Sequence, residues 1–211
     1  MYQRFPKSAL AMLTGTLAFA AVTGIGFTIT TTAASAAGTC TNTITGAHSG
    51  TMTLSGPGVT CLQNATQDGA ITVMNGHELS VVDSKITGAV TSTSSAPFTF
   101  CHSSTVRGAI KVSDSMKPVV IGDNGATCAA NVIDGAVTLD GNKGGTQVAG
   151  NSVGGAVTVS HNVASSGPVI SNNQIGGKLT CSGNTPAPVN NGQPNTVKGE
   201  RVGQTCADGT F

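Results

Sequence analysis

Short segments of alternating apolar and polar residues recur along the chain, each beginning at a glycine. The second and fourth positions after the glycine are apolar in nearly every copy, whereas the first and third are small or hydroxylated. Side chains of a strand point alternately to its two faces, so this pattern predicts strands with one buried face. The copies are Gly50–Leu54, Gly69–Val73, Gly88–Ser92, Gly108–Val112, Gly135–Leu139, Gly155–Val159 and Gly177–Cys181, with a degenerate copy at Gly199.

The spacing of these glycines predicts a stacked repeat fold. Successive gaps are 19, 19, 20, 27, 20, 22 and 22 residues, and the long gap holds an insertion. A fixed period of this size indicates a solenoid in which each coil buries the face of its neighbour. The period is too long for a left-handed helix of three six-residue sides. We expect an all-β, single-stranded parallel β-helix with right-handed winding, about eight coils of 19–22 residues and disulfide staples.

Each coil carries further strand positions. An apolar residue lies two places before most of the glycines, and a second short strand follows each glycine about ten residues later. The first set is Ile86, Val106, Ile133, Val153, Ile175 and Val197. The second set is Val59–Leu62, Leu79–Val82, Phe98–Phe100, Val119–Ile121, Gln147–Val148 and Val169–Ile170.

Serine and asparagine also recur at fixed positions in the coil. Asparagine adopts the left-handed conformation that turns need, and its amide can bond to the next coil. The pattern therefore predicts polar ladders at the corners of a stack. One ladder comprises Ser84, Ser104, Asn131, Asn151, Asn173 and Asn195, and the other comprises Asn142, Asn162 and Asn184.

The N-terminal segment has the layout of a secretory signal peptide. Arg4 and Lys7 precede a long apolar run, and Ala34-Ser35-Ala36 matches a small-residue cleavage site. The apolar run is long enough to serve instead as a retained membrane anchor. We expect cleavage, so that 1–36 is the signal peptide and 37–211 is one domain, with a C-terminal cap from about residue 185. The expected location is extracellular or associated with the cell wall.

Six cysteines follow the predicted cleavage site, which suggests disulfides formed after export. Cys40 and Cys61 are about one coil apart, as are Cys101 and Cys128, and Cys181 and Cys206. Neighbouring coils stack within disulfide reach, so we predict this sequential pairing. Metal binding is the competing interpretation, but the chain has no paired Cys or His motif with ligand spacing, and no metal or cofactor is predicted.

Composition argues against several functions. Residues 37–211 contain eight basic and nine acidic side chains and no tryptophan. There is no basic patch of the kind that binds nucleic acid, so no nucleic-acid partner is expected. Charged residues are only 9% of the chain, but the regular apolar positions favour a packed core over disorder.

The segment from Gly176 to Cys206 contains Gly-Gly-Lys-Leu-Thr-Cys-Ser-Gly-Asn-Thr-Pro-Ala-Pro and ends in Gly-Gln-Thr-Cys. It resembles the ending of a family of small secreted proteins of high-GC Gram-positive bacteria, which are uncharacterised. The resemblance covers about thirty residues, and the family pattern lacks the extra Thr205 and the tail from Ala207 to Phe211. It implies a protein exported by a bacterium and supplies no catalytic residues.

An enzyme is the main alternative, because parallel β-helices often act on acidic polysaccharides with clustered or paired carboxylates. The nine acids do not fall into one column of neighbouring coils; Asp134 and Asp140 share a coil. The four histidines form no column either, and no serine lies in a nucleophile elbow. The insertion near Asp123–Cys128 has two interpretations, a binding loop or a plain loop closed by a disulfide. No catalytic residue is assigned, and an enzyme is not favoured.

The outward face of the repeated strand carries two ranks of small residues. One rank is alanine-rich, from Ala70 to Ala156, and Lys111 interrupts the other. Such a face could pack against a polymer or another protein, or order water as ice-binding solenoids do. Exposed threonine is also common in strands. We therefore predict a non-enzymatic structural or binding protein of the extracellular space or cell wall, with a lyase or glycoside hydrolase and an ice-binding protein as alternatives. The candidate ligand-facing residues are Thr53, Thr72, Thr91, Thr138, Thr158 and Thr180.

Overall fold

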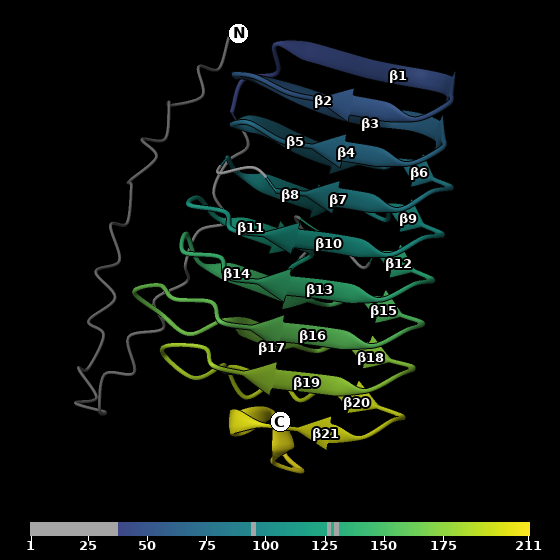
Figure 1. Ribbon diagram of the computed structural model, residues 1–211. Helices are drawn as coiled ribbons and strands as arrows, with labels where there is room; N and C mark the ends of the chain where they lie inside the picture. Colours follow the sequence, from purple (N-terminus) through teal and green to yellow (C-terminus); the bar gives the residue numbers. More distant parts are fainter. Residues whose placement is uncertain (1–37, 94–95, 126–127, 129–130) are drawn as a thin grey trace, which may run out of the picture. The chain divides into compact units, whose positions relative to one another are not determined.

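The computed structural model describes residues 38–93, 96–125, 128 and 131–211. The predicted signal peptide lies outside these residues. Within them the strands pair in parallel and stack coil upon coil as a β-solenoid (Figure 1). In that view each coil crosses the front face from right to left and returns behind while the chain descends from the N-terminal coils, so the winding is right-handed. The predicted all-β parallel β-helix is confirmed.

One face of the solenoid is an eight-stranded sheet, here called sheet B, with one strand from each coil. It is built from the glycine-anchored repeats, and its neighbours lie in register over the whole stack. In order, its strands are β2 (Met52–Leu54), β4 (Ile71–Val73), β7 (Val90–Ser92), β10 (Ile110–Ser113), β13 (Val137–Asp140), β16 (Val157–Ser160), β19 (Leu179–Ser182) and β21 (Arg201–Val202).

The other strands form sheet A, whose two arms share the long strand β3 (Gly58–Asp68), while β1 (Asn42–Ser49) pairs with β3 at the N-terminal end. The first arm continues through β5 (His77–Val82), β8 (Phe98–Cys101), β11 (Val119–Ile121), β14 (Thr146–Ala149) and β17 (Val169–Ser171). The second arm continues through β6 (Lys85–Ile86), β9 (Thr105–Val106), β12 (Val132–Ile133), β15 (Ser152–Val153), β18 (Gln174–Ile175) and β20 (Thr196–Val197).

The core runs along the inside of the stack as rows of identical or similar apolar side chains. Each coil contributes residues from sheet B and from both arms of sheet A, so no coil buries its apolar side without its neighbours. Phe98 and Phe100 of β8 are the largest fully buried side chains. The repeated glycine is required by close backbone approach: a Cβ on Gly155 would lie 2.8 Å from the carbonyl carbon of Gly135.

Both predicted polar ladders are present inside the stack. In the first, the Asn173 side-chain amide donates to Asn195 Oδ1 over 2.8 Å, and that of Asn151 donates to Asn173 Oδ1 over 3.1 Å. In the second, Asn142 donates in the same way to Asn162 over 2.9 Å. These asparagines are almost fully buried. The ladders therefore satisfy backbone groups at the corners of the coils, where the sheets end.

The three predicted disulfides are confirmed. Cys40 pairs with Cys61, Cys101 with Cys128, and Cys181 with Cys206, at sequence separations of 21, 27 and 25 residues. The Cys101–Cys128 bridge closes the coil that carries the insertion. Each bridge joins a coil to the next, as the repeat phase predicted.

The stack continues past residue 185, where we expected the cap to begin. Thr185 and Val189 still form isolated bridges with the preceding coil, and β20 and β21 extend both sheets. The segment rich in proline at Thr185–Pro188 can follow the path of the coil because such single bridges need few ladder bonds.

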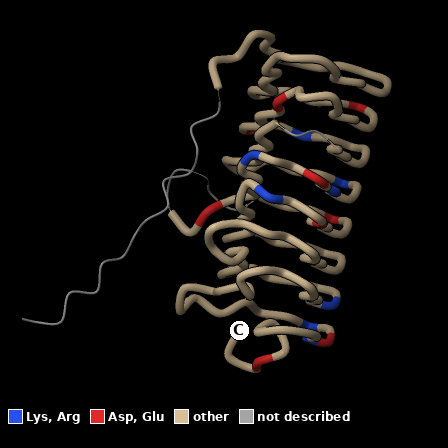
Figure 2. The backbone as a smooth tube through the Cα atoms, turned by 60° about the vertical axis from the view of Figure 1, so that its left-hand side comes forward, with Lys and Arg blue, Asp and Glu red and all other residues tan. Residues whose placement is uncertain are grey.

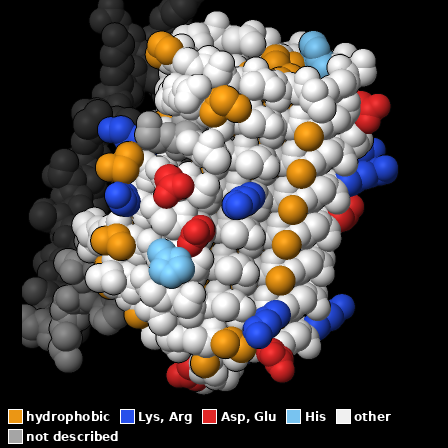
Figure 3. Space-filling view, in the orientation of Figure 1, with side chains coloured by type: hydrophobic (Ala, Val, Ile, Leu, Met, Phe, Trp, Pro, Cys, Tyr) orange, Lys and Arg blue, Asp and Glu red, His pale blue; other side chains and the backbone are white. Residues whose placement is uncertain are grey.

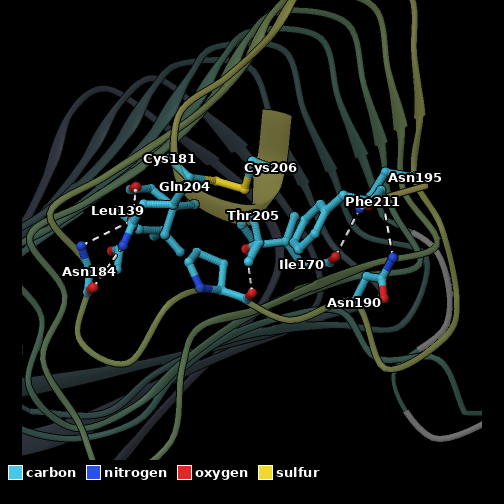
Figure 4. Close-up of a disulfide and its surroundings, with 12 residues drawn as sticks. Leu139, Ile170, Cys181, Asn184, Asn190, Asn195, Gln204, Thr205, Cys206 and Phe211 are labelled. Atoms are coloured by element: carbon cyan, nitrogen blue, oxygen red, sulfur yellow. Dashed lines mark hydrogen bonds between the residues drawn. A yellow bond between two sulfur atoms is a disulfide. The ribbon is translucent and has the colours of Figure 1, made fainter. Parts of the chain in front are cut away.

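The end of the stack is closed by the short 3₁₀ helix η1 (Gln204–Ala207) and the tail to Phe211 (Figure 4). Cys206 is fully buried and Phe211 is 5% exposed. Gln204 Oε1 accepts from the amide of Asn184 over 2.8 Å, and the main-chain oxygen of Phe211 accepts from that of Asn195 over 2.9 Å. In each ladder the last asparagine thus donates to an oxygen that takes the place of a further asparagine Oδ1. The core is covered at this end.

None of the helices among the described residues is long and apolar enough to cross a membrane.

Candidate functional site

The six candidate threonines lie in one column on the outside of sheet B. Thr53 pairs with Thr72 and Thr72 with Thr91, and Thr138 pairs with Thr158 and Thr158 with Thr180. Lys111 joins the two groups, because it pairs with Thr91 on one side and Thr138 on the other. Sequence reasoning therefore placed this column correctly, including its interruption. Neighbours in it are separated by one strand spacing, about 4.8 Å.

A second column runs beside the first and consists of the alanines that follow the anchor glycines. The backbone amide of the residue after an alanine donates to the carbonyl of the alanine in the next coil, for example Val90 to Ala109 and Val137 to Ala156. In Figure 3 this column is the straight row of hydrophobic side chains on the front face. The alanine methyls and threonine side chains are half-buried or exposed. We call the two columns together the Thr/Ala face.

Sheet B is also held rigidly from behind. Its inward residues, such as Val137, Leu139 and Val157, are fully buried in the core. The second asparagine ladder follows the strands at one edge of the sheet, and the glycine stack precedes them at the other. A surface supported in this way keeps its side chains in fixed rows, which lowers the entropic cost of binding.

Charges are sparse along the stack (Figure 2), and few lie on the Thr/Ala face. Lys111 is the one charged member of the threonine column. Lys178 takes the alanine position in the coil of β19, where its Nζ lies 3.3 Å from Glu200 Oε2. Both side chains are well exposed, so this ion pair contributes little to stability. The face between these lysines presents methyl and hydroxyl groups.

A polar cluster that the sequence did not reveal lies at the edge of this face. Ser160 Oγ donates to Asp140 Oδ1 over 2.7 Å, and His161 Nδ1 lies 2.9 Å from the same oxygen. The hydrogen bonds from His161 and Ser160 hold the pKa of the Asp140 carboxyl below its ordinary value of 3.8. The side chains of His161 and Asp140 are 71% and 47% exposed.

This cluster was missed because the sequence was compared position by position. Asp140 ends its strand at the fifth place after its glycine, and His161 is at the sixth place in the next coil. His161 has a φ of 52°, the left-handed conformation, in the turn before the ladder residue Asn162. The turn brings the imidazole back over the preceding coil. Comparing each position with the adjacent positions of the next coil, and not only with the same position, would have found the pair.

The arrangement does not match an acyl-transfer or glycosidase site. Ser160 bonds to the carboxylate and not to the imidazole, whereas a nucleophilic serine needs an adjacent base. Asp140 is the last residue of β13, whereas Asp134 lies in the turn before that strand. The two carboxylates therefore do not flank one substrate bond, as the paired catalytic carboxylates of glycosidases do. Within the described part of the chain, no three His, Cys, Asp or Glu side chains gather as metal ligands.

The insertion in the long coil forms a loop held by its own contacts. Asp123 Oδ1 accepts from the backbone amides of Gly125 and Cys128, over 2.9 and 3.2 Å. The Asn124 amide donates to Ser171 Oγ, which belongs to a strand two coils further along. These bonds and the Cys101–Cys128 bridge fit a structural loop. Among the described residues of this loop, they bring together no convergent set of functional groups.

Comparison with family models, with curated proteins and with solved structures found no match. The geometry of the Thr/Ala face therefore carries the functional argument.

Proposed function

We propose that this chain is a non-enzymatic binding protein of the extracellular space or cell wall, whose Thr/Ala face docks on a repetitive, uncharged polymer such as a cell-wall polysaccharide. The proposal includes export, which rests on the predicted signal peptide and is compatible with three disulfides. The partner's chemistry follows from the face: rows of hydroxyls can bond to hydroxyls, and rows of methyls can pack on apolar sugar faces.

The observation that carries the proposal is the dominance of threonine in one column of sheet B, where Lys111 and Val202 are the two exceptions among eight members. Columns elsewhere on the same solenoid are mixed. The corresponding outward column of the second arm of sheet A is mixed. Since strand propensity acts equally on both columns, it does not explain why threonine dominates only one of them. The mixed column reads Thr66, Lys85, Thr105, Val132, Ser152, Gln174 and Thr196.

The face also differs from the binding sites of proteins that recognise soluble sugars. Sugar rings in such sites stack on aromatic side chains, and this chain contains no tryptophan and one tyrosine, at position 2. Weak contacts of methyls and hydroxyls become useful when they are repeated along a rigid row, because the contacts after the first add binding energy without a new loss of translational freedom. A long insoluble polymer meets this requirement, and a short soluble oligosaccharide does not.

The test is a pull-down of the purified, oxidised protein with cellulose, chitin, pectin and isolated cell wall, with soluble sugar assayed in the same tubes. The altered protein carries Thr138→Lys and Thr158→Lys, which are paired neighbours in the column. The matched control carries Ser152→Lys and Gln174→Lys, which are paired neighbours on the second arm. Both doubles add the same charge to adjacent coils.

We expect the Thr138→Lys/Thr158→Lys protein to bind at least about tenfold more weakly, a loss of about 1.4 kcal/mol, and the control to bind normally. Lys111→Thr joins the two groups of threonines into one unbroken run and should strengthen binding. Replacing the same two threonines by valine keeps their shape and shows whether the hydroxyls are needed. Equal binding by both lysine doubles, or release of soluble sugar by the unaltered protein, contradicts the proposal. Retention on ice with thermal hysteresis, and no polymer binding, favours the ice-binding alternative.

A further inference from the structure

The N-terminal end of the solenoid has an open strand edge. Among the described residues, β1 pairs only with β3, at one of its two sides. Seven of its eight residues are exposed and the eighth, Ile44, is half-buried. Figure 1 shows β1 as the outermost strand at this end. The other side of β1 therefore offers a row of backbone N–H and C=O groups to a further strand.

This edge lacks most of the features that usually prevent strand pairing. Natural edge strands carry lysine or proline, or are very short. β1 has eight residues, no proline, no acidic or basic residue except His48, and one register shift between Ile44 and Gly46. From Gly46 to Ser49 the pairing with β3 is regular. An uncharged strand of this kind can approach a second copy of itself without repulsion of like charges.

The opposite end of the stack excludes a head-to-tail arrangement. There η1, the Cys181–Cys206 bridge and Phe211 cover the core, and Gln204 and Phe211 already accept the last ladder amides (Figure 4). Within the described chain, β20 and β21 also pair on one side only, but each has two residues and offers too short an edge for strand pairing. The open end can therefore match only another open end, which is the geometry of an isologous pair.

We propose that two copies of this chain associate through β1, with the two β1 strands antiparallel about a two-fold axis perpendicular to sheet A. Sheet A would then run continuously through both copies, and the half-buried Ile44 and Met52 at the open end would be covered. A two-fold axis in this direction leaves both copies of sheet B on the same side. If the proposed function holds, the pair presents two Thr/Ala faces to one polymer and gains affinity through bivalency.

The backbone identifies a position at which the edge can be blocked. Gly50 donates its N–H to Asp68 on β3. Along a strand successive N–H groups point to opposite sides, so the N–H of Ala47 points away from β3 and toward the proposed partner. Ala47→Pro removes that donor and leaves the bonds to β3 in place. Ala47→Lys keeps the donor and adds a charge at the edge, and Ala47→Ser is the matched control.

Sedimentation equilibrium of the purified, oxidised protein over a wide concentration range tests the proposal. The unaltered protein and Ala47→Ser should sediment at twice the monomer mass, and Ala47→Pro and Ala47→Lys at the monomer mass. Circular dichroism and a thiol count should show that all variants keep the fold and the three disulfides. The lysine variant keeps the test valid if the proline variant folds poorly.

Two results would overturn the pairing. One is a monomer at every concentration, which would also be the outcome if another part of the chain covers β1. The other is a dimer that Ala47→Pro and Ala47→Lys leave intact. The Thr138→Lys/Thr158→Lys protein should remain a dimer, so loss of polymer binding and loss of pairing are separate results. A dimer that binds no polymer would refute the proposed function alone.

Discussion

Replacing Asn173 by alanine removes the centre of the longer asparagine ladder. Its Oδ1 accepts from the backbone amide and the side-chain amide of Asn151, over 3.0 and 3.1 Å. Its own amide donates to the carbonyl of Val148 over 2.9 Å and to Asn195 over 2.8 Å. All four hydrogen bonds disappear in Asn173→Ala. The backbone bonds of residue 173 remain: its amide still donates to Asn195 Oδ1, and its carbonyl still accepts from the amide of Thr196.

The expected cost follows from the burial of these partners. A typical net contribution is about 1 kcal/mol for each hydrogen bond, and more where a buried group is left without a partner. The Asn151 backbone amide loses its acceptor at a site that is 2% exposed. We therefore expect Asn173→Ala to lower the free energy of unfolding by about 4 kcal/mol. In a chain of this size that corresponds to a fall in Tm of about 8–16 °C.

Gln174→Ala is the matched control, because Gln174 is the next residue and points the same amide outward from β18. Its loss should change the free energy of unfolding by less than about 0.5 kcal/mol. Thermal unfolding by circular dichroism and denaturant unfolding, both on the oxidised proteins, provide the measurement. If the two variants unfold within about 2 °C of each other, the ladder is only a consequence of the stacking and does not stabilise it.

Three further predictions concern the coils and the edge of the face. Gly155→Ala places a Cβ 2.8 Å from the Gly135 carbonyl and should destabilise by more than about 1 kcal/mol, whereas Gly209→Ala, with open space around it, should have no effect on Tm. Replacing Cys181 and Cys206 together by serine should lower the free energy of unfolding by about 3 kcal/mol in the same assay. The pKa of Asp140 is lowered, so its contribution to stability is present above the pKa of the unfolded chain and is lost as pH falls through the folded pKa. Asp140→Asn should remove that part of the acid dependence of Tm, an effect below about 1 kcal/mol because the pair is exposed. An unchanged pH profile would show that the pair with His161 does not form in solution.

The repeat made most of the fold predictable from sequence. Once the glycines fixed the phase, residues at one position in successive coils had to be neighbours. This placed the Thr column, both ladders and the partner of each cysteine. Cys101 and Cys128 are 27 residues apart, which is longer than one regular coil. They still pair, because the insertion adds residues between them without changing their positions in the coil.

The parts that were missed depend on contacts outside a single phase. His161 reaches Asp140 diagonally, through a left-handed turn that the count does not show. The segment Thr185–Pro188 has the composition of a strand breaker, but in the structure Thr185 still bridges Val163. The closure by Phe211 could not be predicted either, because its role is played by a main-chain oxygen that any residue carries.

The fold itself leaves the outer surface free to vary. Inward positions must be apolar because the neighbouring coils bury them, and the glycine must be small because it lies against the backbone of the preceding coil. Outward positions have no such requirement: Lys111 occupies the threonine column without disturbing the register of β10 with β7 or β13. The second arm shows the same tolerance in its mixed column. The dominance of threonine in this column therefore needs a reason outside the packing of the solenoid, and a partner with a matching repeat provides one.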